Sequence, residues 1–466
     1  MNLTDTTLDE KRLSYFIIGF LALFSAIYNA FIPLHGDEAY YWVWSHNLQG
    51  GYYDHAPMIA YFIAVTNLIS ESEWGIRLVN VICMSISALY IYKLTELIGD
   101  ARKALNALIV FASVLLVQAG YTMTTPDSPL ILFWTLTLYY GYRALFENRT
   151  RFFLLTGLFL GAAMLSKYTG ILLAVSLVLF MLAKRRDLFL DWRMYMAIII
   201  ASLVVSPMLW WNYQNDWISF TFQLEHGGSK SSELSLNTFF DFLGGQFLIF
   251  TPVFTGLLFY FLIKTRLFYT RSALFFIALS AAFPILFFLY KGLYTTMGLN
   301  YAAPAYIGAA IIVGWAVDEY GFKKWFKAGV IVAVLLSLIA RLGMLFYLEI
   351  VQDRMYGNKE AVALVAKHAK EDDAFYGNHL TVAALLSYYL PSHPEAQIPT
   401  ITRMSQYDLW KSGEPWKDGL YLGSHDPREK ELKTLFDNVT LLETYTVPRG
   451  IDRTKTFYIY RVEGAK

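Results

Sequence analysis

Long apolar runs recur along the first three quarters of the chain. The first, residues 13–34, has about the length that a helix needs to cross a bilayer. It exceeds the apolar core of a signal peptide and only Lys11 and Arg12 precede it, so we expect an uncleaved first membrane helix. Ten more runs of spanning character follow, at about 74–97, 104–121, 127–146, 152–166, 170–183, 194–211, 243–263, 272–290, 301–317 and 327–347.

This pattern predicts a polytopic α-helical membrane protein with about 11 spans, in a range of 10–13. The runs at 152–166 and 170–183 are short, and either one re-entrant hairpin or two tilted spans would accommodate them. After residue 347 the pattern changes to that of a small α/β domain, residues 348–466. Helices are predicted there near 358–370, 379–390 and 427–437, and strands near 373–377, 419–423, 439–447 and 456–462.

Composition agrees with this division. The chain is 56% hydrophobic and only 16% charged, whereas a soluble protein carries about a quarter charged residues. Of its 75 charged residues, 32 lie from Glu349 onward. A net charge of +1 gives no general argument for nucleic-acid binding, and the single cysteine, Cys83, is expected to pack in the core.

The distribution of Lys and Arg predicts the topology. With a cytoplasmic N-terminus, the inner segments carry eighteen cations and the outer segments before the C-terminal domain carry four. Because positive charge favours the cytoplasmic side, this places the first loop (about 35–73) and the C-terminal domain outside. The outer cations are Arg77, Lys167, Lys230 and Lys291.

These outer cations run against the usual bias and need a reason. Lys230 lies in a polar loop and is explained by solvation alone. Arg77, Lys167 and Lys291 lie at or inside the ends of spans, where we expect each to need an anionic partner, either a carboxylate or a ligand. For Lys291, anchoring at the membrane interface is an equally good explanation.

The first outer loop carries the densest group of candidate residues. Asp37 and Glu38 directly follow the first apolar run, and a cluster of aromatic side chains comes after them. Asp37 could simply cap a short interfacial helix at 38–48, with Glu38 in its first turn, or the pair could perform chemistry. Gly50 and Gly51 would end that helix, and a second one is predicted at 57–70.

Further acids and cations are predicted on the same outer face. Asp127 stands where a helix would begin, so capping is again an alternative to a site role. Carboxylates and cations at the outer leaflet suit a polar substrate with an anionic leaving group, such as a lipid-linked sugar phosphate. Lys or Arg would meet the phosphate, and a carboxylate would take the proton of an attacking hydroxyl.

Four motifs, in order along about the first 180 residues, resemble those of bacterial membrane glycosyltransferases. The family is that of the dolichyl-phosphate-mannose protein mannosyltransferases, a broad group that includes the lipid A aminoarabinose transferase. Later spans match only in general layout. The motifs are His35-Gly36-Asp37-Glu38-Ala39-Tyr40-Tyr41-Trp42 with Tyr53-Asp54-His55-Ala56-Pro57-Met58, then Glu73-Trp74-Gly75-Ile76-Arg77-Leu78, Thr124-Thr125-Pro126-Asp127-Ser128-Pro129-Leu130 and Leu165-Ser166-Lys167-Tyr168-Thr169-Gly170.

The resemblance implies a GT-C fold, a polyprenyl-phosphate sugar donor and inverting transfer. It implies that Asp37 is the general base, that Asp127 is a second acid of the cavity, and that Lys167 lies near the donor phosphate. Glu38 would assist Asp37 by orienting substrate or balancing charge. Donor-phosphate or substrate contacts are expected from Arg77, His55, Lys291 and Tyr40, although Ala56-Pro57 replaces the family's Pro-Pro and a neutral His55 is a weaker phosphate partner than Lys.

The expected function is therefore transfer of a sugar to an extracytoplasmic acceptor (lipid A, another glycolipid, a polysaccharide or a protein) at a bacterial inner membrane. A transporter or flippase for an anionic or sugar-linked lipid is the alternative, but the sequence shows no inverted repeat. A purely structural scaffold would leave Asp37, Asp127 and Lys167 unexplained. The sequence identifies no cofactor with certainty. A divalent metal at Asp37, Glu38 and His55 is an open alternative, although their spacing is not a ligand signature.

Overall fold

The computed structural model describes the chain except residues 1–2, 228–233, 265–270, 400–402, 412 and 414. The described residues form two compact units. The helical unit comprises Met1–Tyr28, His55–Ile59 and Arg77–Leu338. The mixed unit comprises Asn29–Asp54, Ala60–Ile76 and Ile339–Lys466, so it contains most of the first loop together with the C-terminal elements.

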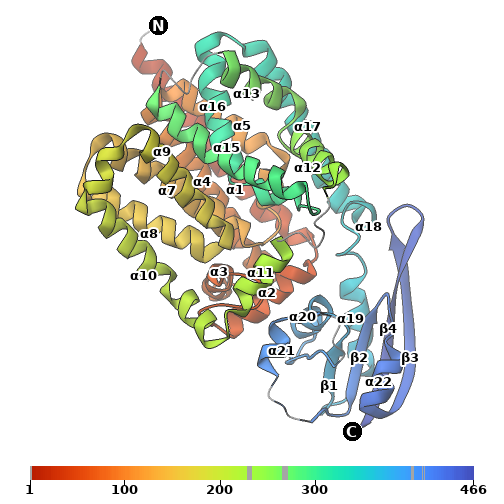
Figure 1. Ribbon diagram of the computed structural model, residues 1–466. Helices are drawn as coiled ribbons and strands as arrows, with labels where there is room; N and C mark the ends of the chain where they lie inside the picture. Colours follow the sequence, from red (N-terminus) through yellow and green to blue (C-terminus); the bar gives the residue numbers. More distant parts are fainter. Residues whose placement is uncertain (1–2, 228–233, 265–270, 400–402, 412, 414) are drawn as a thin grey trace. The chain divides into compact units, whose positions relative to one another are not determined.

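The helical unit is built almost entirely from α-helices (Figure 1). Two of its helices, α4 and α17, continue across the boundary into the mixed unit. The helices are α1 (Leu3–Tyr28), α4 (Glu73–Ile98), α5 (Ala101–Ser113), α6 (Leu115–Gly120), α7 (Asp127–Glu147), α8 (Thr150–Ser166), α9 (Ile171–Lys184), α10 (Trp192–Gln214), α11 (Ile218–Gly227), α12 (Leu236–Ile249), α13 (Pro252–Lys264), α15 (Ser272–Gly292), α16 (Ala305–Tyr320) and α17 (Lys323–Phe346), with short 3-10 turns η2 (Tyr168–Gly170), η3 (Arg186–Leu190) and η4 (Leu299–Ala302).

Each predicted apolar run lies mainly on helix, which confirms a largely helical protein with several apolar helices. Within the described residues, five helices are long and apolar enough to cross a bilayer, or six if α12 and α13 count as one bent span. Length and composition alone thus support fewer spans than the eleven predicted. The remaining runs form shorter or less apolar helices, among them α8 and α9.

Two predicted single spans are in fact broken. The run at 243–263 bends by 99° between α12 and α13. Pro252 disfavours a helical conformation at the residue before it, and Thr251 takes the left-handed region at φ 64. The run at 104–121 breaks at Val114, where the backbone is extended, and the side-chain amide of Gln118 donates to the carbonyl of Ala112 that the break releases.

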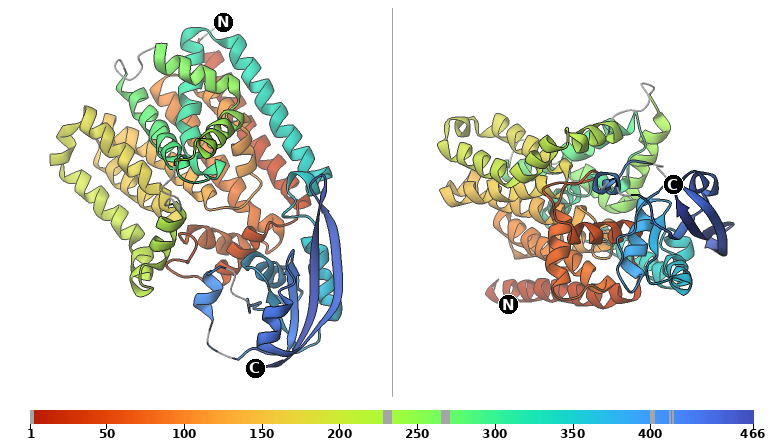
Figure 2. Two further views of the ribbon diagram at one scale, coloured as in Figure 1. Left: turned by 45° about the vertical axis from the view of Figure 1, so that its right-hand side comes forward. Right: turned by 90° about the horizontal axis from the view of Figure 1, so that it is seen from below.

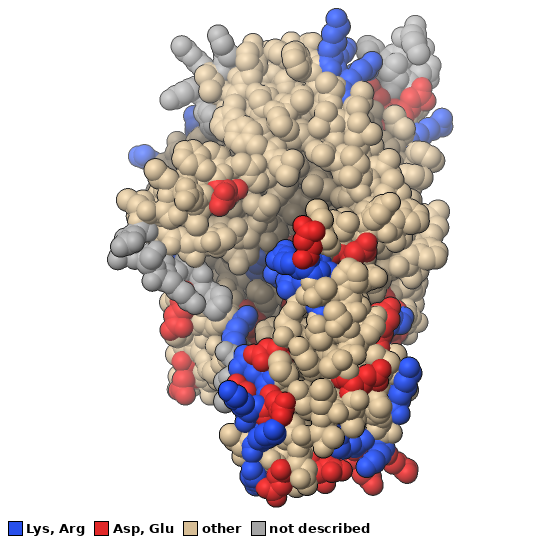
Figure 3. Space-filling model, turned by 90° about the vertical axis from the view of Figure 1, so that its right-hand side faces the viewer, with Lys and Arg blue, Asp and Glu red and all other residues tan. Residues whose placement is uncertain are grey.

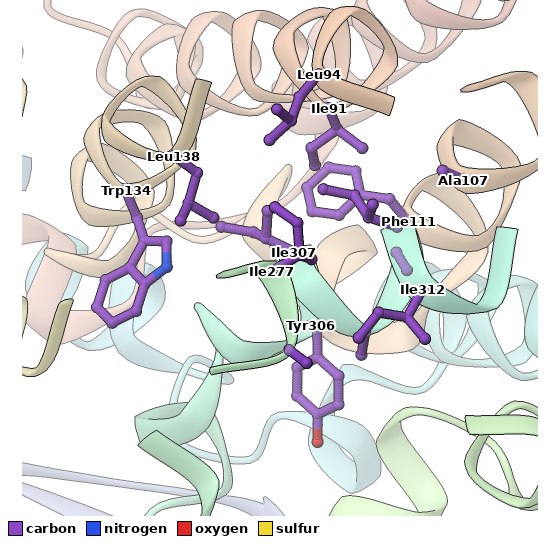
Figure 4. Close-up of a cluster of buried hydrophobic side chains, with 14 of the residues drawn as sticks. Ile91, Leu94, Ala107, Phe111, Trp134, Leu138, Ile277, Tyr306, Ile307 and Ile312 are labelled. Atoms are coloured by element: carbon purple, nitrogen blue, oxygen red, sulfur yellow. The ribbon is translucent and has the colours of Figure 1, made fainter. Parts of the chain in front are cut away.

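The core of the helical unit is a single apolar cluster. Side chains of α4, α5, α7, α15 and α16 interdigitate there, including Phe111, Trp134, Ile277 and Ile307 (Figure 4). The buried Cys83 belongs to α4, as expected for a packing role. Such an interior is close-packed, so changes of one or two methylene groups are felt by the neighbours.

Helices α8 and α10 pack against each other at unusually close range. A Cβ atom on Gly157 would lie 2.2 Å from the backbone oxygen of Ala197, and one on Gly161 would lie 2.7 Å from that of Ala201. Glycines four residues apart therefore face alanines four residues apart, which is the small-residue packing that brings membrane helices together. The two helices lie side by side in Figures 1 and 2.

The mixed unit combines a four-stranded sheet with short helices. Strand order is β1-β2-β4-β3, with β1 and β2 parallel and the remaining pairs antiparallel. The elements are η1 (Asn29–Phe31), α2 (Gly36–His46), α3 (Met58–Asn67, whose first two residues belong to the helical unit), α18 (Leu348–Val351), α19 (Asn358–His368), β1 (Ala374–Gly377), α20 (Leu380–Tyr389), α21 (Gln406–Trp410), β2 (Gly419–Ser424), α22 (Glu429–Leu435), β3 (Phe436–Arg449) and β4 (Arg453–Ala465).

In the C-terminal part of the chain, α19, α20, α22 and β1 to β4 overlap the ranges expected from the sequence, whereas α18 and α21 lie outside them. The β3–β4 hairpin extends well beyond the other strands of the sheet (Figure 2). Charged side chains gather over the C-terminal part of the chain, whereas the face of the helical unit seen in Figure 3 is mostly uncharged. This contrast follows the charge distribution of the sequence.

Within the mixed unit, α2 of the first loop packs directly against α20. A Cβ atom on Gly36 would come within 2.5 Å of the Cβ of Thr381, so only glycine fits at the start of α2. The backbone N–H of Leu34 also donates to the hydroxyl of Tyr389 at the end of α20. The start of the Asp37 helix is therefore held by the C-terminal part of the chain.

Candidate active site

The helix that carries Asp37 begins with a capping box. Its N-cap is His35, whose Nδ1 accepts from the backbone N–H of Asp37 at 3.1 Å. The carboxylate of Glu38 accepts from the backbone N–H of His35 at 2.9 Å. The alternative in which Asp37 itself caps the helix is thus wrong: the reciprocal His35–Glu38 pair satisfies the orphan N–H groups instead.

This cap separates the two acids of the motif. Glu38 is 1% exposed and its carboxylate is engaged at the helix start. The Asp37 side chain is 49% exposed and lies 3.5 Å from Nδ1 of His35. Asp37 can accordingly meet a substrate, whereas the observed contact of Glu38 keeps the backbone of the first turn in place.

A buried network follows Asp37 along α2. The hydroxyl of Tyr40 donates to Oδ2 of Asp54 at 2.8 Å, and the guanidinium of Arg403 pairs with the other carboxylate oxygen. Burial raises the pKa of Asp54 to about 6, against the lowering effect of Arg403 and of the Tyr40 hydrogen bond. The Tyr40 ring is 2% exposed, so its direct contacts are with the protein.

In the helical unit, Asp127 and Lys167 form a buried ion pair. Lys167 follows the C-terminus of α8 and donates from Nζ to Oδ1 of Asp127 at 2.7 Å. Asp127 is the first residue of α7, but the N-cap position belongs to Pro126 and no side-chain cap bond is formed. The Asp127 carboxylate therefore pairs with Lys167 and does not cap the helix.

Two residues of η4 complete this cluster. Nδ2 of Asn300 donates to Oδ2 of Asp127 at 2.7 Å, and the ring of Tyr301 lies 5.2 Å from Nζ of Lys167. Both carboxylate oxygens of Asp127 thus have a donor, and the lysine also faces an aromatic ring. The cluster orients a cation and a carboxylate side by side.

Residues of α12 and α16 hold η4 in place. Nε2 of Gln246 donates to the carbonyl of Leu299 at 3.1 Å, and the hydroxyl of Tyr306 donates to Oε1 of Gln246. The Tyr306 ring packs at the edge of the apolar core with its hydroxyl directed away from it (Figure 4). Asn300 is therefore fixed through its neighbour by a buried glutamine.

A cavity of about 690 Å³ opens beside the ion pair, within the helical unit. Its walls are mostly apolar and come from α8, α9, α10 and α15. Along α8 the lining residues follow one helical face and end at Lys167. The polar side chains that line it include Lys167, Lys291, His55, Tyr301 and Gln223.

The structure thus places the predicted site residues in two groups. Lys167, Lys291 and His55 line one cavity of the helical unit, and Asp127 contacts Lys167. Arg77 belongs to the same unit, where it is fully buried near the start of α4 and does not line this cavity. Asp37, Glu38 and Tyr40 belong to the mixed unit. Lys230 lies outside the described residues.

Some residues of these clusters were not singled out from the sequence. Asn300 and Tyr301 lie in η4, at the start of the apolar run predicted at 301–317, and Arg403 lies in a domain without a recognisable motif. No local signal marks them, because their partners are more than a hundred residues away in the chain. Among the described residues, no group of three or more His, Cys, Asp and Glu could hold a metal ion, the trio Asp37, Glu38 and His55 included.

Comparison with known proteins agrees with this architecture. A model of the family described as dolichyl-phosphate-mannose-protein mannosyltransferase matches residues 54–211. ArnT of Cupriavidus metallidurans, crystallised with undecaprenyl phosphate, superposes with a TM-score of 0.69 at 15% identity, over 98% of each chain. The chain has the GT-C fold. The same GT-C enzyme in its apo state gives a TM-score of 0.67 over 96% of this chain and 98% of that one, again at 15% identity.

A curated relative of this GT-C protein is the lipid A galacturonosyltransferase RgtD of Rhizobium johnstonii. The two sequences are 27% identical over 308 residues, which is 62% of this chain. The match spans about 61% of the length of that relative. The resemblance to the bacterial mannosyltransferase and lipid A transferase type is confirmed.

Proposed function

We propose that this GT-C protein transfers a sugar from a polyprenyl-phosphate donor to an extracytoplasmic acceptor, with lipid A as the leading candidate. The observation that carries the proposal is the apolar cavity that ends at the Lys167–Asp127 pair. An apolar chain and an anionic head are the two parts of a lipid-linked sugar phosphate. The family match, the galacturonosyltransferase and ArnT with its bound undecaprenyl phosphate support the same substrate class.

The cavity suits the lipid part of the donor. Its stripe along α8, from Phe153 to Lys167, is roughly 21 Å long at a rise of about 1.5 Å per residue. Polyprenyl carbons would lie against Gly157, Leu160 and Met164. The phosphate would meet Lys167 and Lys291, the two lysines of the lining.

The Lys167–Asp127 pair also suits departure of the phosphate. When the bond between the sugar and the phosphate oxygen breaks, the lipid phosphate gains a negative charge. Lys167 and Lys291 stabilise this charge where it develops, in mostly apolar surroundings. Asp127, held by Asn300, keeps the Lys167 ammonium oriented before the donor arrives.

Acid–base chemistry is assigned to the first loop. Asp37 takes the proton of the acceptor hydroxyl while that oxygen attacks the anomeric carbon and the phosphate leaves, which inverts the configuration. Its exposed side chain on a firmly capped helix fits this role. Glu38 and Tyr40 act by holding that helix, and His55 contributes a polar contact to the donor cavity. Arg77 is proposed as a buried ion-pair residue.

Topology and domain division complete the proposal. The protein spans the inner membrane of a bacterium about eleven times, with broken and short helices counted as spans. Its N-terminus is cytoplasmic, and the domain from residue 348 to 466 lies outside together with the first loop. The excess of Lys and Arg in the inner segments supports this orientation.

The decisive experiment compares lipid A and surface glycans by mass spectrometry in cells with and without the gene, and with Asp37→Asn. We expect a sugar modification that is lost in both the deletion and the variant, while Asp452→Asn, on an exposed turn of the mixed unit, retains it. If Asp37→Asn supports the parental level of modification, the assignment of the base is wrong. Lipid translocation by reconstituted protein without any sugar transfer would favour the flippase alternative.

A further inference from the structure

We infer that residues Arg403–Tyr407 of the C-terminal region are a positioning element for the loop that carries Asp37. They set the rate of sugar transfer and leave binding of the acceptor largely unchanged. The inference rests on the proposed function and assigns a role in it to the C-terminal domain. All residues involved belong to the mixed unit.

Gln406 is the centre of this element. It is 1% exposed, and its Oε1 accepts from the backbone N–H of Tyr53 at 2.8 Å. Its Nε2 donates to Oε1 of Gln49 at 3.3 Å, and its own backbone N–H donates to the hydroxyl of Tyr40 at 2.8 Å. One side chain and its peptide group thus bind α2 and two positions of the loop between α2 and α3.

Arg403 and Tyr407 reinforce the same contact. The Asp54 carboxylate receives the guanidinium of Arg403 on one oxygen and the Tyr40 hydroxyl on the other. The rings of Tyr40 and Tyr407 stack with centroids 5.6 Å apart and planes inclined by 19°. A continuous hydrogen-bonded chain therefore runs from Arg403 through Asp54 and Tyr40 to Gln406.

A helix cap holds the first residues of α21 within this element. Ser405 begins α21 with a capping box, in which the carboxylate of Asp408 accepts from the backbone N–H of Ser405 at 2.7 Å. This fixes the peptide group of Gln406 that meets Tyr40. The contact thus joins two helices, α2 and α21, that each begin with a capping box.

The chain of contacts ends one helical turn from Asp37. Tyr40 follows Asp37 by three positions on α2, so the two side chains are neighbours on the helix surface. At the other end of the helix, Trp44 stacks on Tyr52 with centroids 4.2 Å apart. Rotation or displacement of α2 would move Asp37, and the Tyr40 network opposes both.

Stability alone does not explain this network. The Asp54 carboxylate is buried while the Arg403 side chain is 41% exposed, so desolvation of the acid and screening of the cation leave the pair little net contribution to stability. What the network provides is a fixed conformation of residues 36–54. A base that is misplaced by about 1 Å can lose roughly a hundredfold in rate, so such geometry has a direct kinetic consequence.

The test uses the full-length protein in nanodiscs, with polyprenyl-phosphate galacturonic acid as donor and lipid A as acceptor. Gln406→Leu removes the side-chain bonds to Gln49 and Tyr53, and Arg403→Gln removes the ion pair. We expect kcat to fall about 10- to 100-fold in each, with KM for the acceptor changed less than about threefold. Arg403→Lys should recover much of the rate, and Lys433→Gln on α22 is the matched control.

Hydrogen exchange supplies a readout that does not depend on activity. In Gln406→Leu, amides of residues 36–54 should exchange at least tenfold faster while those of β2 and β4 remain protected. Unchanged exchange in residues 36–54, or a raised acceptor KM at constant kcat, would overturn the inference. Parental protein that transfers no sugar would instead refute the proposed function, and the exchange result would still decide the inference.

Discussion

The ammonium group of Lys167 donates to the carboxylate of Asp127 at 2.7 Å, and both side chains are nearly buried. A donor phosphate that binds Lys167 must compete with this carboxylate. The two residues should therefore affect binding of an anionic lipid in opposite directions, although they form one pair.

We expect Lys167→Gln to weaken binding of undecaprenyl phosphate by at least about tenfold, since it removes one of the two lysines that line the cavity. Asp127→Asn should strengthen binding severalfold, because the lysine keeps its charge and loses its competitor. Microcalorimetry in detergent measures both. Each single change also leaves a buried charge without its partner, at a cost of about 3–5 kcal/mol, so the double variant should be more stable than either single variant. Weaker binding of undecaprenyl phosphate by Asp127→Asn would show that Asp127 does not compete with the phosphate for Lys167.

The Gln246 contacts give a second prediction. Gln246→Leu leaves the carbonyl of Leu299 and the hydroxyl of Tyr306 without this partner, at about 1–3 kcal/mol per buried group. Because η4 then loses its hydrogen bond to Gln246, Asn300 and Tyr301 should move away from Asp127 and Lys167. The transfer rate should then fall roughly tenfold. Gln214→Leu, on an exposed position of α10, is the control. A parental rate in Gln246→Leu would show that η4 is held by other contacts.

Close packing of α8 and α10 predicts a steric effect on the cavity wall. In Gly157→Val, the new Cβ would overlap the backbone oxygen of Ala197, so the helices must separate. We expect a loss of about 1–3 kcal/mol in stability and weaker binding of undecaprenyl phosphate. Gly256→Val should be tolerated, since no atom lies within 4 Å of its added Cβ. Thermal unfolding and lipid titration of the two variants test this difference.

The buried Asp54 predicts opposite effects of acid on stability and on rate. Its pKa is raised from 3.8 to about 6 in the folded protein, so the folded state binds the proton more tightly. The resulting stabilisation is complete below about pH 4 and is lost as the pH rises through 6, by at most about 3 kcal/mol. Transfer should follow the reverse course and fall below pH 6, because protonated Asp54 no longer pairs with Arg403.

The charged and titratable groups that act on Asp54 are Arg403, Tyr40 and Asp37. In Arg403→Gln, the acid limb of the pH–rate profile should move to higher pH, because loss of the guanidinium raises the pKa of Asp54. Asp54→Asn should remove the pH dependence of stability between 4 and 6. Profiles that coincide for the parental protein and Arg403→Gln would exclude Asp54 as the group that titrates.

Helices and the positions of several candidate residues were predictable because their signals are local. Runs of apolar residues defined the helices, and charges at their ends marked Asp127 and Lys167. The break at Val114 and the role of Gln118 were not predictable, since no glycine or proline marks that position. The bend at Thr251 could have been foreseen from Pro252, which stands in the middle of the predicted run.

The cap of α2 shows a different limit. Sequence preference favours Asp over His at an N-cap, so Asp37 was the natural choice. The capping box depends instead on the Glu38 carboxylate, which turns back and accepts from the backbone N–H of His35. The spacing of the residues alone does not show whether Asp37 or the His35–Glu38 pair caps the helix. Arg403 and Asn300 could not be predicted as partners of Asp54 and Asp127, because tertiary packing, and not periodicity, brings them together.

The contacts of Gln406 also set an order of events during synthesis. Gln406 lies 353 residues after Tyr53 and 366 after Tyr40, so the loop emerges long before its partner exists. At about 5–20 residues per second, roughly 20–70 seconds separate the two segments during translation. The Asp37 loop of a nascent chain therefore lacks its contacts with Gln406 throughout that interval.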